Sequence, residues 1–295
     1  MTKEILALFP GQGSQFVGMG KELIAKSSLA QEHFEIADER LGFKLSSLCF
    51  NGPLEELTLT ANAQPAILTV SVIAYRLAQK DGGERPVAAA GHSLGEYSAL
   101  VAAGALDFAD AVELVRKRGE YMQNAVSAGS GSMLAVLGKE IEEIKEKLKE
   151  LDDLLEIANI NAPGQIVLSG RKSAAEKFKQ IAAGWKVIEL NVSAPFHCSL
   201  MKPAADSLKK DLDKVEIKPP LFPVIANFLA RPLTDPTEIR EALCNQVCGA
   251  VRWTESMEVA IKTFAITYAV EYGPGAVLNG LLKRINSKIE RINVC

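Results

Sequence analysis

The sequence predicts an α/β fold with a parallel-sheet core and an inserted α+β unit. Short, continuously apolar runs that end at Gly or Pro are typical of strands buried on both faces of a parallel sheet. Segments with the apolar spacing of helices lie between these runs, and such alternation is typical of α/β proteins. A stretch near the middle of the chain instead follows the order β-α-β-β-α-β.

The N-terminal part of the chain alternates short strands with helices. The expected elements are a strand at 5–9, a helix at 65–79, a strand at 86–90, a helix after Gly95 and a helix from about Phe108. The helix after Gly95 is indicated by small or apolar residues that recur at i, i+3, i+4 and i+7 from Tyr97. Asp107 has the short polar side chain that caps a helix N-terminus, so it should begin the next helix.

The middle of the chain has a different organisation. We expect strands at 133–137, 155–160, 165–169 and 186–192, helices at 139–151 and 173–183, and a turn at 161–164. This order is the ferredoxin-like arrangement, and a unit of this kind can form a small core of its own. We therefore expect a small ferredoxin-like subdomain at 128–194, inserted into a large α/β domain formed by 1–127 and 195–295.

The C-terminal part contains the elements that would complete the large sheet. Two further apolar runs, at 221–227 and 265–271, are expected to be buried strands. A turn at 273–275 then precedes a helix at 276–285.

Composition excludes several classes of function. The chain has 295 residues, 48% of them hydrophobic, and a net charge of −3, which excludes a disordered chain and argues against a nucleic-acid binder. No run approaches the ~18 apolar residues of a membrane span. Glu4 and Pro10 interrupt the first apolar run, so no signal peptide is expected. Five scattered cysteines without a zinc-ligand pattern indicate reduced thiols, a cytoplasmic location and no metal site.

The segment Gly91-His92-Ser93-Leu94-Gly95 matches the G-x-S-x-G nucleophile elbow. A predicted strand precedes it and a predicted helix follows it, as this motif requires. Glycines allow the chain to double back closely, which lifts the serine hydroxyl clear of the sheet. The first N–H groups of the following helix then point toward the hydroxyl, where they can hold an oxyanion. The alternative is a chance match in a Gly-rich loop.

A serine needs a base, and the chain contains only three histidines. His33 lies in a charged helical stretch, where we expect a solvated surface position. His92 is inside the elbow and should point away from Ser93, which favours packing or hydrogen bonding. His197 follows a predicted strand and Pro195 in a loop, so by elimination it is the candidate base. The alternative is a buried structural histidine.

The group that orients the imidazole is left open by the residues. Asp206 is close in sequence to His197 but falls in the next predicted helix. A main-chain carbonyl can accept the same hydrogen bond from Nδ1–H.

Arg118 falls on the apolar stripe of its helix, four residues after Leu114 and three after Val115. An inward-facing guanidinium is costly unless it pairs with an anion. Two interpretations remain: a structural pair with an internal carboxylate, or a receptor for a substrate carboxylate, for which the planar fork of Arg is suited.

The Gly-rich segment at 11–15 follows the first predicted strand. Phe16 stands where the dinucleotide fingerprint needs its third glycine, and the Lys-Ser/Thr of a phosphate-binding loop is absent. A main-chain N–H of this segment can serve as a second oxyanion donor; the alternative is a tight turn without a ligand.

Several motifs, taken together, resemble one known family. These are Phe9-Pro-Gly-Gln-Gly-Ser-Gln15, Gly91-His-Ser-Leu-Gly-Glu-Tyr-Ser98, Arg118-Gly119, Asn159-Ile-Asn-Ala-Pro-Gly-Gln165 and Phe196-His-Cys198. In this order they are similar to the malonyl-coenzyme A:acyl carrier protein transacylases of bacterial fatty-acid synthesis, from Leu8 to at least Trp253. The resemblance implies a hydrolase-like α/β domain that carries a ferredoxin-like subdomain.

The resemblance also implies catalytic roles. Ser93 would carry the malonyl group as an ester, and His197 would act as general base and then general acid. The N–H groups of Gln12 and Leu94 would form the oxyanion hole. The family orients its histidine through a main-chain carbonyl, and the matching position is Gln246.

The substrate-binding residues implied by the resemblance are Arg118, Phe196, Gln246, Asn159 and Asn161. Arg118 would grip the malonyl carboxylate. The ring of Phe196 would crowd the branching methyl group of a methylmalonyl donor. Asn159 and Asn161 match a family stretch near the mouth of the cleft.

The implied reaction is ping-pong transfer of malonyl from malonyl-CoA to the phosphopantetheine thiol of acyl carrier protein, without a cofactor beyond the substrates. We expect a monomer with no nucleic-acid or membrane partner. One alternative is a malonyl-specific, trans-acting acyltransferase of polyketide synthesis. Others are a serine thioesterase or esterase and a non-catalytic carrier-binding module.

Overall fold

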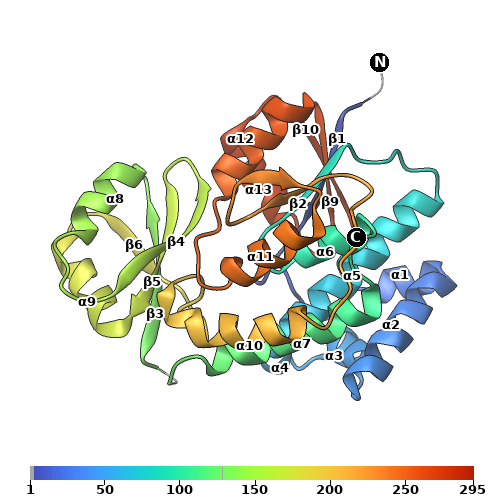
Figure 1. Ribbon diagram of the computed structural model, residues 1–295, viewed down its shortest axis with the longest axis horizontal. Coiled ribbons are helices and arrows are strands. Elements are labelled where there is room, and N and C mark those ends of the chain that lie inside the picture. The colour runs from blue at the N-terminus through green and yellow to red at the C-terminus, as the bar shows by residue number, and fades with distance from the viewer. Residues whose placement is uncertain (1–2, 128) are drawn as a thin grey trace.

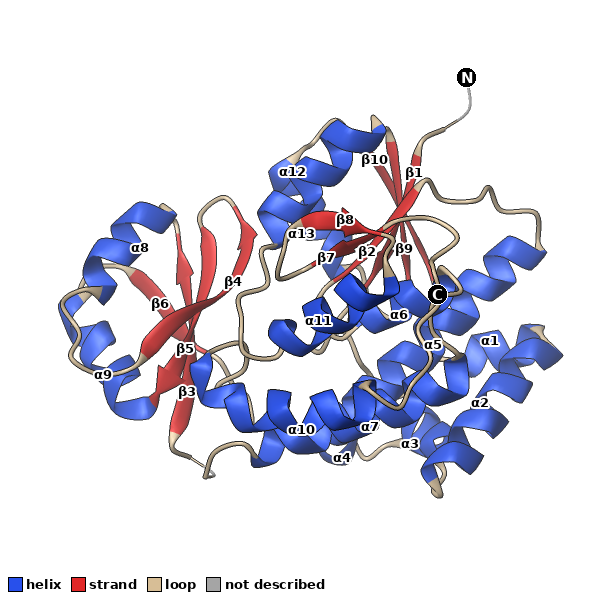
Figure 2. Cartoon of the chain, viewed as in Figure 1, coloured by secondary structure: helices blue, strands red, loops and turns tan. Residues whose placement is uncertain are grey.

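The structure, a computed structural model, describes residues 3–127 and 129–295 and is built around two sheets (Figures 1 and 2). The larger sheet has six strands in the order β10-β9-β1-β2-β7-β8, and all but β8 run parallel to their neighbours. The smaller sheet has four antiparallel strands in the order β4-β5-β3-β6. The predicted α/β class, with a mainly parallel sheet and a ferredoxin-like unit, is confirmed.

The first strand lies in the middle of the larger sheet. Its five apolar residues are all buried, and they alternate between the two faces. Ala7 and Phe9 join the larger hydrophobic core, whereas Leu6 and Leu8 join a second core on the opposite face. The strands are β1 (Ile5–Phe9), β2 (Ala88–Gly91), β7 (Val224–Ala226), β8 (Arg231–Leu233), β9 (Tyr268–Tyr272) and β10 (Glu290–Val294).

Helices cover both faces of the larger sheet (Figure 1). The larger core contains buried residues of α2, α5, α6 and α7, and the second core contains those of α12 and α13. No helix in the described ranges combines the length and the apolar character needed to cross a membrane. The helices are α1 (Lys21–Lys26), α2 (Ser28–Leu41), α3 (Leu45–Asn51), α4 (Leu54–Thr58), α5 (Thr60–Lys80), α6 (Gly95–Ala102), α7 (Phe108–Asn124), α10 (Lys202–Leu212), α11 (Pro236–Gln246), α12 (Trp253–Phe264) and α13 (Val277–Ile285).

The smaller sheet packs its two faces against different partners. Leu134 and Val136 of β3 join a separate core with α8 and α9. Met133, on the other face of the same strand, belongs to the larger core. One face of this sheet is therefore directed toward the larger sheet. Its elements are β3 (Gly131–Leu137), α8 (Ile141–Leu148), β4 (Leu155–Ala162), β5 (Gln165–Arg171), α9 (Lys172–Ile181) and β6 (Lys186–Glu189).

Several predicted boundaries differ from the structure. The strand expected at 221–227 spans only Val224–Ala226, because Leu221 is 65% exposed and lies outside the sheet. The strand expected at 265–271 begins at Tyr268, and β4 continues to Ala162 through half of the expected turn. The edge strands β8 and β10 were not predicted, because their short, half-exposed sequences lack a continuous apolar run. Residues 1, 2 and 128, which include the expected domain boundary, lie outside the described residues.

Candidate active site

Ser93 lies in a tight turn between β2 and α6. Its φ of +52° is in the left-handed region, where a non-glycine residue is strained. A Cβ on Gly91 would lie 1.9 Å from the carbonyl carbon of Gly95, and one on Gly95 would lie 2.0 Å from the carbonyl oxygen of Phe9. Both glycines are therefore required by the close approach of β1, β2 and α6.

A buried asparagine holds this turn from behind. The Ser93 N–H donates to Asn227 Oδ1 at 2.6 Å, and Asn227 Nδ2 donates to the carbonyl of Gly91 at 2.7 Å. Asn227 follows β7 directly and is fully buried. It therefore fixes both ends of the strained turn.

His197 is placed to accept a proton from Ser93. The Ser93 hydroxyl donates to His197 Nε2 at 2.8 Å, and His197 Nδ1–H donates to the main-chain carbonyl of Gln246 at 2.8 Å. Burial, together with the charge of Arg118, lowers the pKa of His197 to about 3. The imidazole is thus neutral near pH 7, and its Nε2 has a free lone pair for the serine proton.

Of the two orienting groups that the sequence left open, the structure contains the carbonyl of Gln246. Asp206 lies on α10 and forms an exposed ion pair with Lys202 instead. The tautomer of His197 is therefore set by a neutral acceptor.

Arg118 faces inward from α7 and is fully buried, so its predicted orientation is confirmed. Its Nη1 donates to Gln64 Oε1 at 2.7 Å, and its Nη2 donates to Gln246 Oε1 at 2.9 Å and to Ser93 Oγ at 3.0 Å. The guanidinium carbon also lies 5.4 Å from the ring centre of Tyr97. Among the described residues, no carboxylate contacts it.

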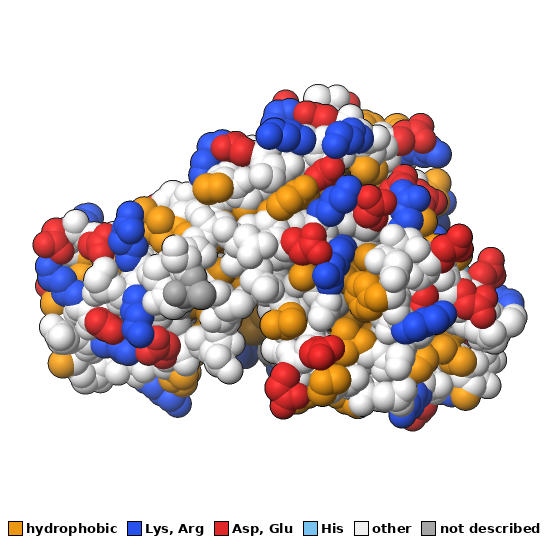
Figure 3. Space-filling model, turned by 90° about the horizontal axis from the view of Figure 1, so that it is seen from below, with side chains coloured by type: hydrophobic (Ala, Val, Ile, Leu, Met, Phe, Trp, Pro, Cys, Tyr) orange, Lys and Arg blue, Asp and Glu red, His pale blue; other side chains and the backbone are white. Residues whose placement is uncertain are grey.

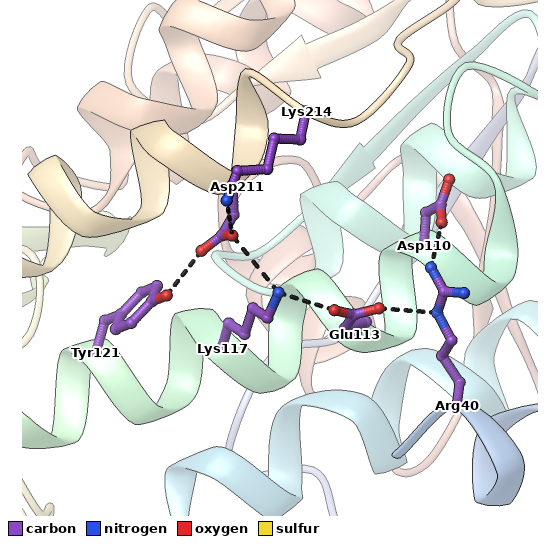
Figure 4. A network of polar contacts seen from close by, with 7 residues as sticks. All are labelled: Arg40, Asp110, Glu113, Lys117, Tyr121, Asp211 and Lys214. Carbon is purple, nitrogen blue, oxygen red and sulfur yellow. Dashed lines mark hydrogen bonds and ion pairs between the residues drawn. The ribbon is translucent and has the colours of Figure 1, made fainter. Parts of the chain in front are cut away.

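A chain of ion pairs on the outer side of α7 fixes the helix that carries Arg118 (Figure 4). Arg40 on α2 binds Asp110 at 2.7 Å and Glu113 at 2.8 Å. Lys117 bridges Glu113 and Asp211 at 2.8 and 3.5 Å, and the Tyr121 hydroxyl donates to Asp211 at 2.7 Å. These partly exposed pairs contribute little individually. Together they connect α7 to both α2 and α10.

Gln12 and Leu94 both line the cavity that contains Ser93. Leu94 immediately precedes α6, so its N–H belongs to the positive end of that helix. Neither N–H donates to another group in the part of the chain that the structure describes. Both donors are consequently available to an oxyanion.

These groups share a cavity of about 360 Å³ between the two sheets. Met133 and Val167 contribute to its wall from the smaller sheet, and Phe196 contributes from the loop before His197. In the view of Figure 3 the surface is hollowed between the part that carries the smaller sheet and the helical part. Residues that face this cavity lie close to Ser93, the candidate nucleophile.

The two predicted asparagines lie at this cavity, but Gln246 does not line it. Asn161 and His92 form a hydrogen bond of 2.8 Å through Oδ1 and Nε2, as expected for a hydrogen-bonding His92. Asn159 is 7% exposed. Gln246 is fully buried behind Arg118 and Ser93. Its contact is with the guanidinium and the imidazole rather than with the cavity.

The prediction for His33 is wrong. His33 is 5% exposed, its Nδ1–H donates to the Leu29 carbonyl at 2.7 Å, and its Nε2 accepts from Arg76. Its ring centre lies 4.9 Å from that of Phe108. The charged neighbours of His33 face solvent, whereas His33 occupies the face of α2 that packs on α5 and α7.

Three polar residues of the site were missed from the sequence: Gln64, Glu96 and Asn227. Gln64 lies in an otherwise apolar stretch of α5, and Glu96 is the one charged residue of the fully buried α6. For Gln64 and Glu96 the sequence did contain a signal, namely a polar side chain within a buried helix, because such groups need hydrogen-bond partners. In the described residues, no group of three or more His, Cys, Asp or Glu side chains is arranged to hold a metal ion.

Comparison with known proteins gives consistent matches over nearly the whole chain. The acyl transferase domain model matches residues 7–287. The malonyl CoA-acyl carrier protein transacylase of Bacillus subtilis (strain 168) is 50% identical over 99% of this chain and 93% of its own length. A polyketide biosynthesis malonyl CoA-acyl carrier protein transacylase of the same organism is 40% identical over 97% of this chain and 98% of its own.

Solved structures agree with these matches. An acyl carrier protein S-malonyltransferase from Vibrio cholerae O1 superposes with a TM-score of 0.96 at 43% identity, covering 99% of this chain and 97% of its own. A malonyl-transacylase in complex with its type II PKS acyl-carrier protein superposes with a TM-score of 0.95 at 42% identity, covering 99% and 96%. The similarity therefore extends through both sheets.

Proposed function

The chain belongs to the acyl transferase family, and we propose that it transfers the malonyl group of malonyl-CoA to the phosphopantetheine thiol of an acyl carrier protein. The observation that carries this proposal is the buried guanidinium of Arg118, which lies 3.0 Å from Ser93 Oγ and contacts no carboxylate among the described residues. A site for a neutral acyl group has no need of such a charge. A malonyl group presents a carboxylate beside its thioester, and Arg binds carboxylates with matched geometry.

In the first half-reaction, His197 Nε2 takes the Ser93 proton as Oγ attacks the thioester carbonyl carbon. The N–H groups of Gln12 and Leu94 stabilise the oxyanion. The intermediate collapses, the carbon–sulfur bond breaks, and protonated His197 gives its proton to the departing thiolate of coenzyme A. Malonyl remains as an ester on Ser93.

The second half-reaction reverses these steps with a different thiol. His197 deprotonates the phosphopantetheine thiol, the thiolate attacks the ester, and Ser93 Oγ recovers the proton from His197 as it leaves. Arg118 holds the carboxylate throughout and orients the acyl group for the thiol. Phe196 limits the space at the carbon that a methylmalonyl donor would branch. Asn159 and Asn161 line the approach to this space.

We assign the activity to fatty-acid synthesis, as the resemblance of the motifs implies; the name of the 50% identical relative mentions no polyketide. A trans-acting malonyltransferase of polyketide synthesis is the second candidate, and the 40% identical polyketide relative favours it. Acyl carrier proteins from the two pathways, compared as malonyl acceptors, distinguish the two candidates.

On the face drawn in Figure 3, acidic and basic side chains are interspersed, so a carrier protein that docks there would rely on individual ion pairs.

We further propose that 128–194 forms a subdomain distinct from the rest of the chain, which the separate core of β3, α8 and α9 supports. A cytoplasmic location is in line with the five cysteines, all free in the described residues. The reaction as written needs no resident cofactor, and we propose a monomer.

The proposal is tested by intact-protein mass spectrometry after mixing the protein with malonyl-CoA. We expect a malonyl adduct on the wild type that holo acyl carrier protein discharges, no adduct on Ser93→Ala, and acylation of His197→Ala slowed ~10²–10⁴-fold. An adduct lost to water at the same rate with and without carrier protein would show a hydrolase instead. No adduct with malonyl-CoA, with an adduct from another acyl donor, would overturn the malonyl assignment.

A further inference from the structure

A buried carboxylate lies directly behind the nucleophile, and the reaction described above does not use it. Glu96 is the second residue of α6 and is 3% exposed. Its Oε2 accepts from the main-chain N–H of Asn227 at 2.9 Å and from the side-chain Nε2 of Gln246 at 2.8 Å. Glu96 is not among the residues that line the cavity. A buried charge of this kind is costly and therefore calls for a role.

Both partners of Glu96 hold parts of the active site. Asn227 holds the Ser93 turn through its side-chain amide. Gln246 Nε2 also donates to the Ser93 carbonyl at 2.9 Å, and Gln246 Oε1 accepts from Arg118 at 2.9 Å. The main-chain carbonyl of Gln246 orients His197. Glu96 is thus linked through Gln246 to Arg118, His197 and the main chain of Ser93, and through Asn227 to the same turn.

The Gln246 amide can face either way by size alone, because its oxygen and nitrogen ends have nearly the same shape. An ionised carboxylate only accepts hydrogen bonds, so Glu96 requires the NH₂ end of Gln246 to face it. The oxygen end is then turned toward Arg118. With the amide reversed, its NH₂ would face the guanidinium, and two donors would oppose each other.

We propose that Glu96 is the positioning residue for Arg118: by accepting from Gln246 it turns the amide oxygen toward the guanidinium and holds Arg118 beside Ser93. This inference rests on the proposed function, in which Arg118 binds the malonyl carboxylate. A carboxylate in direct contact with Arg118 would compete with that substrate group. Separated by one amide, Glu96 offsets the buried positive charge and leaves the guanidinium free for substrate.

The first test compares donors in Glu96→Gln, which keeps the size and removes the charge. The glutamine can donate as well as accept, so of the contacts that orient the Gln246 amide only those with the Ser93 carbonyl and Arg118 remain. Rates of Ser93 acylation by malonyl-CoA and acetyl-CoA are measured by quenched-flow mass spectrometry. We expect the ratio of the malonyl rate to the acetyl rate to fall at least ~10-fold, the loss of about one charged hydrogen bond. A purely structural role would slow both donors equally and leave the ratio unchanged, which would overturn the proposal.

A matched control is Asp38→Asn, which also neutralises a buried carboxylate. Asp38 accepts from Ser46 N and Oγ at 2.8 and 2.7 Å, on α2 and away from the cavity. This variant should keep the wild-type donor ratio even where it loses stability. The wild type is measured first: absence of a malonyl preference there refutes the proposed function itself, whatever Glu96→Gln does.

A second test uses only the wild type, so it does not depend on the folding of a variant. Burial raises the pKa of Glu96 to about 7, so its carboxyl is mostly ionised at pH 8 and mostly protonated at pH 6. A protonated carboxyl can donate, so its contribution to orienting the Gln246 amide is lost and only the Ser93 carbonyl and Arg118 hold it. The donor ratio should therefore fall several-fold, up to ~10-fold, from pH 8 to pH 6. A constant ratio across this range would contradict the inference.

Few ionisable groups lie around Glu96. Arg118 on α7 is the one charge that shifts the pKa of Glu96, and burial raises the pKa of the neighbouring Tyr97 far above this range. Burial lowers the pKa of both His92 and His197, and that of His197 to about 3, so His197 stays neutral in this range. The packed strands β1, β2 and β7 carry no ionisable side chain. On α5 the ionisable residues begin at Tyr75, eleven residues beyond Gln64. On α7, apart from Arg118, they belong to the network of Figure 4 or to the separate ion pair of Arg116 with Glu120.

Discussion

The guanidinium of Arg118 donates to the hydroxyl of Ser93 at 3.0 Å, while the same hydroxyl donates to His197 at 2.8 Å. Ser93 Oγ is thus held from two sides before any substrate arrives. Acylation of Oγ replaces the hydroxyl with an ester. The Nη2 group of Arg118 then loses this contact, in line with the proposal that it binds the carboxylate of the malonyl ester.

Arg118→Ala should remove the preference for a charged acyl group. Acylation by malonyl-CoA should fall ~10–100-fold, the cost of losing a hydrogen bond to a charged group, and acylation by acetyl-CoA should fall less. The control is Lys117→Ala on the same helix, which disturbs only the partly exposed network of Figure 4. Rates of adduct formation with the two donors test this. If Arg118→Ala retained the malonyl preference, the carboxylate-receptor role would be wrong.

Phe196→Ala should widen the cavity beside Ser93. Phe196 is 8% exposed and lines the cavity, and we propose that its ring takes the space that a branching methyl group would need. The rate with methylmalonyl-CoA relative to malonyl-CoA should rise ~10-fold, in the range that one methyl-sized difference gives. Competition between the two donors, read by the mass of the adduct, measures this ratio. An unchanged ratio would show that another residue sets the limit.

Two Gly→Ala variants should differ sharply in stability. At Gly95 a Cβ would lie 2.0 Å from the Phe9 carbonyl oxygen, so Gly95→Ala must displace β1 or α6 and should cost more than about 4 kcal/mol. At Gly42 nothing lies within 4 Å, and the cost is that of a left-handed residue, ~1–2 kcal/mol. Urea denaturation of both variants checks the order. Equal losses of unfolding free energy in the two variants would mean that the turn can accommodate a Cβ at Gly95, which would contradict this prediction.

His33 should contribute to the loss of stability in acid. Burial lowers the pKa of His33 below 6.5, so the unfolded chain binds a proton more readily than the folded chain. Stability from the neutral imidazole is therefore present above pH 6.5 and is lost as the pH falls below it. The stability difference between wild type and His33→Gln should shrink between pH 8 and pH 5, measured as urea midpoints. A difference that stays constant or grows would contradict this.

Local patterns were enough to locate the centre of the site. The elbow at 91–95 is contiguous, Arg118 follows from its helical stripe, and His197 follows from a choice among three histidines. The network behind them was not accessible in this way. Glu96 meets Asn227 across 131 residues and Gln246 across 150, and no periodicity links positions so far apart. The prediction for His33 was wrong for a related reason. Its charged neighbours lie on the outer face of α2, whereas His33 lies on the face that packs against α5 and α7.

The central position of the first strand has a consequence for synthesis on the ribosome. Leu6 pairs with Ala88 on one edge of β1. The other edge stays unpaired until β9 is synthesised, because its Tyr268 pairs with Ile5. The turn of Ser93 likewise lacks its hydrogen bonds to Asn227 and Gln246 until those residues are synthesised. A nascent chain therefore carries the nucleophile long before it can use it, with an apolar strand edge exposed in the meantime. Catalytic competence arrives late in translation, once the segment beyond residue 246 has left the exit tunnel.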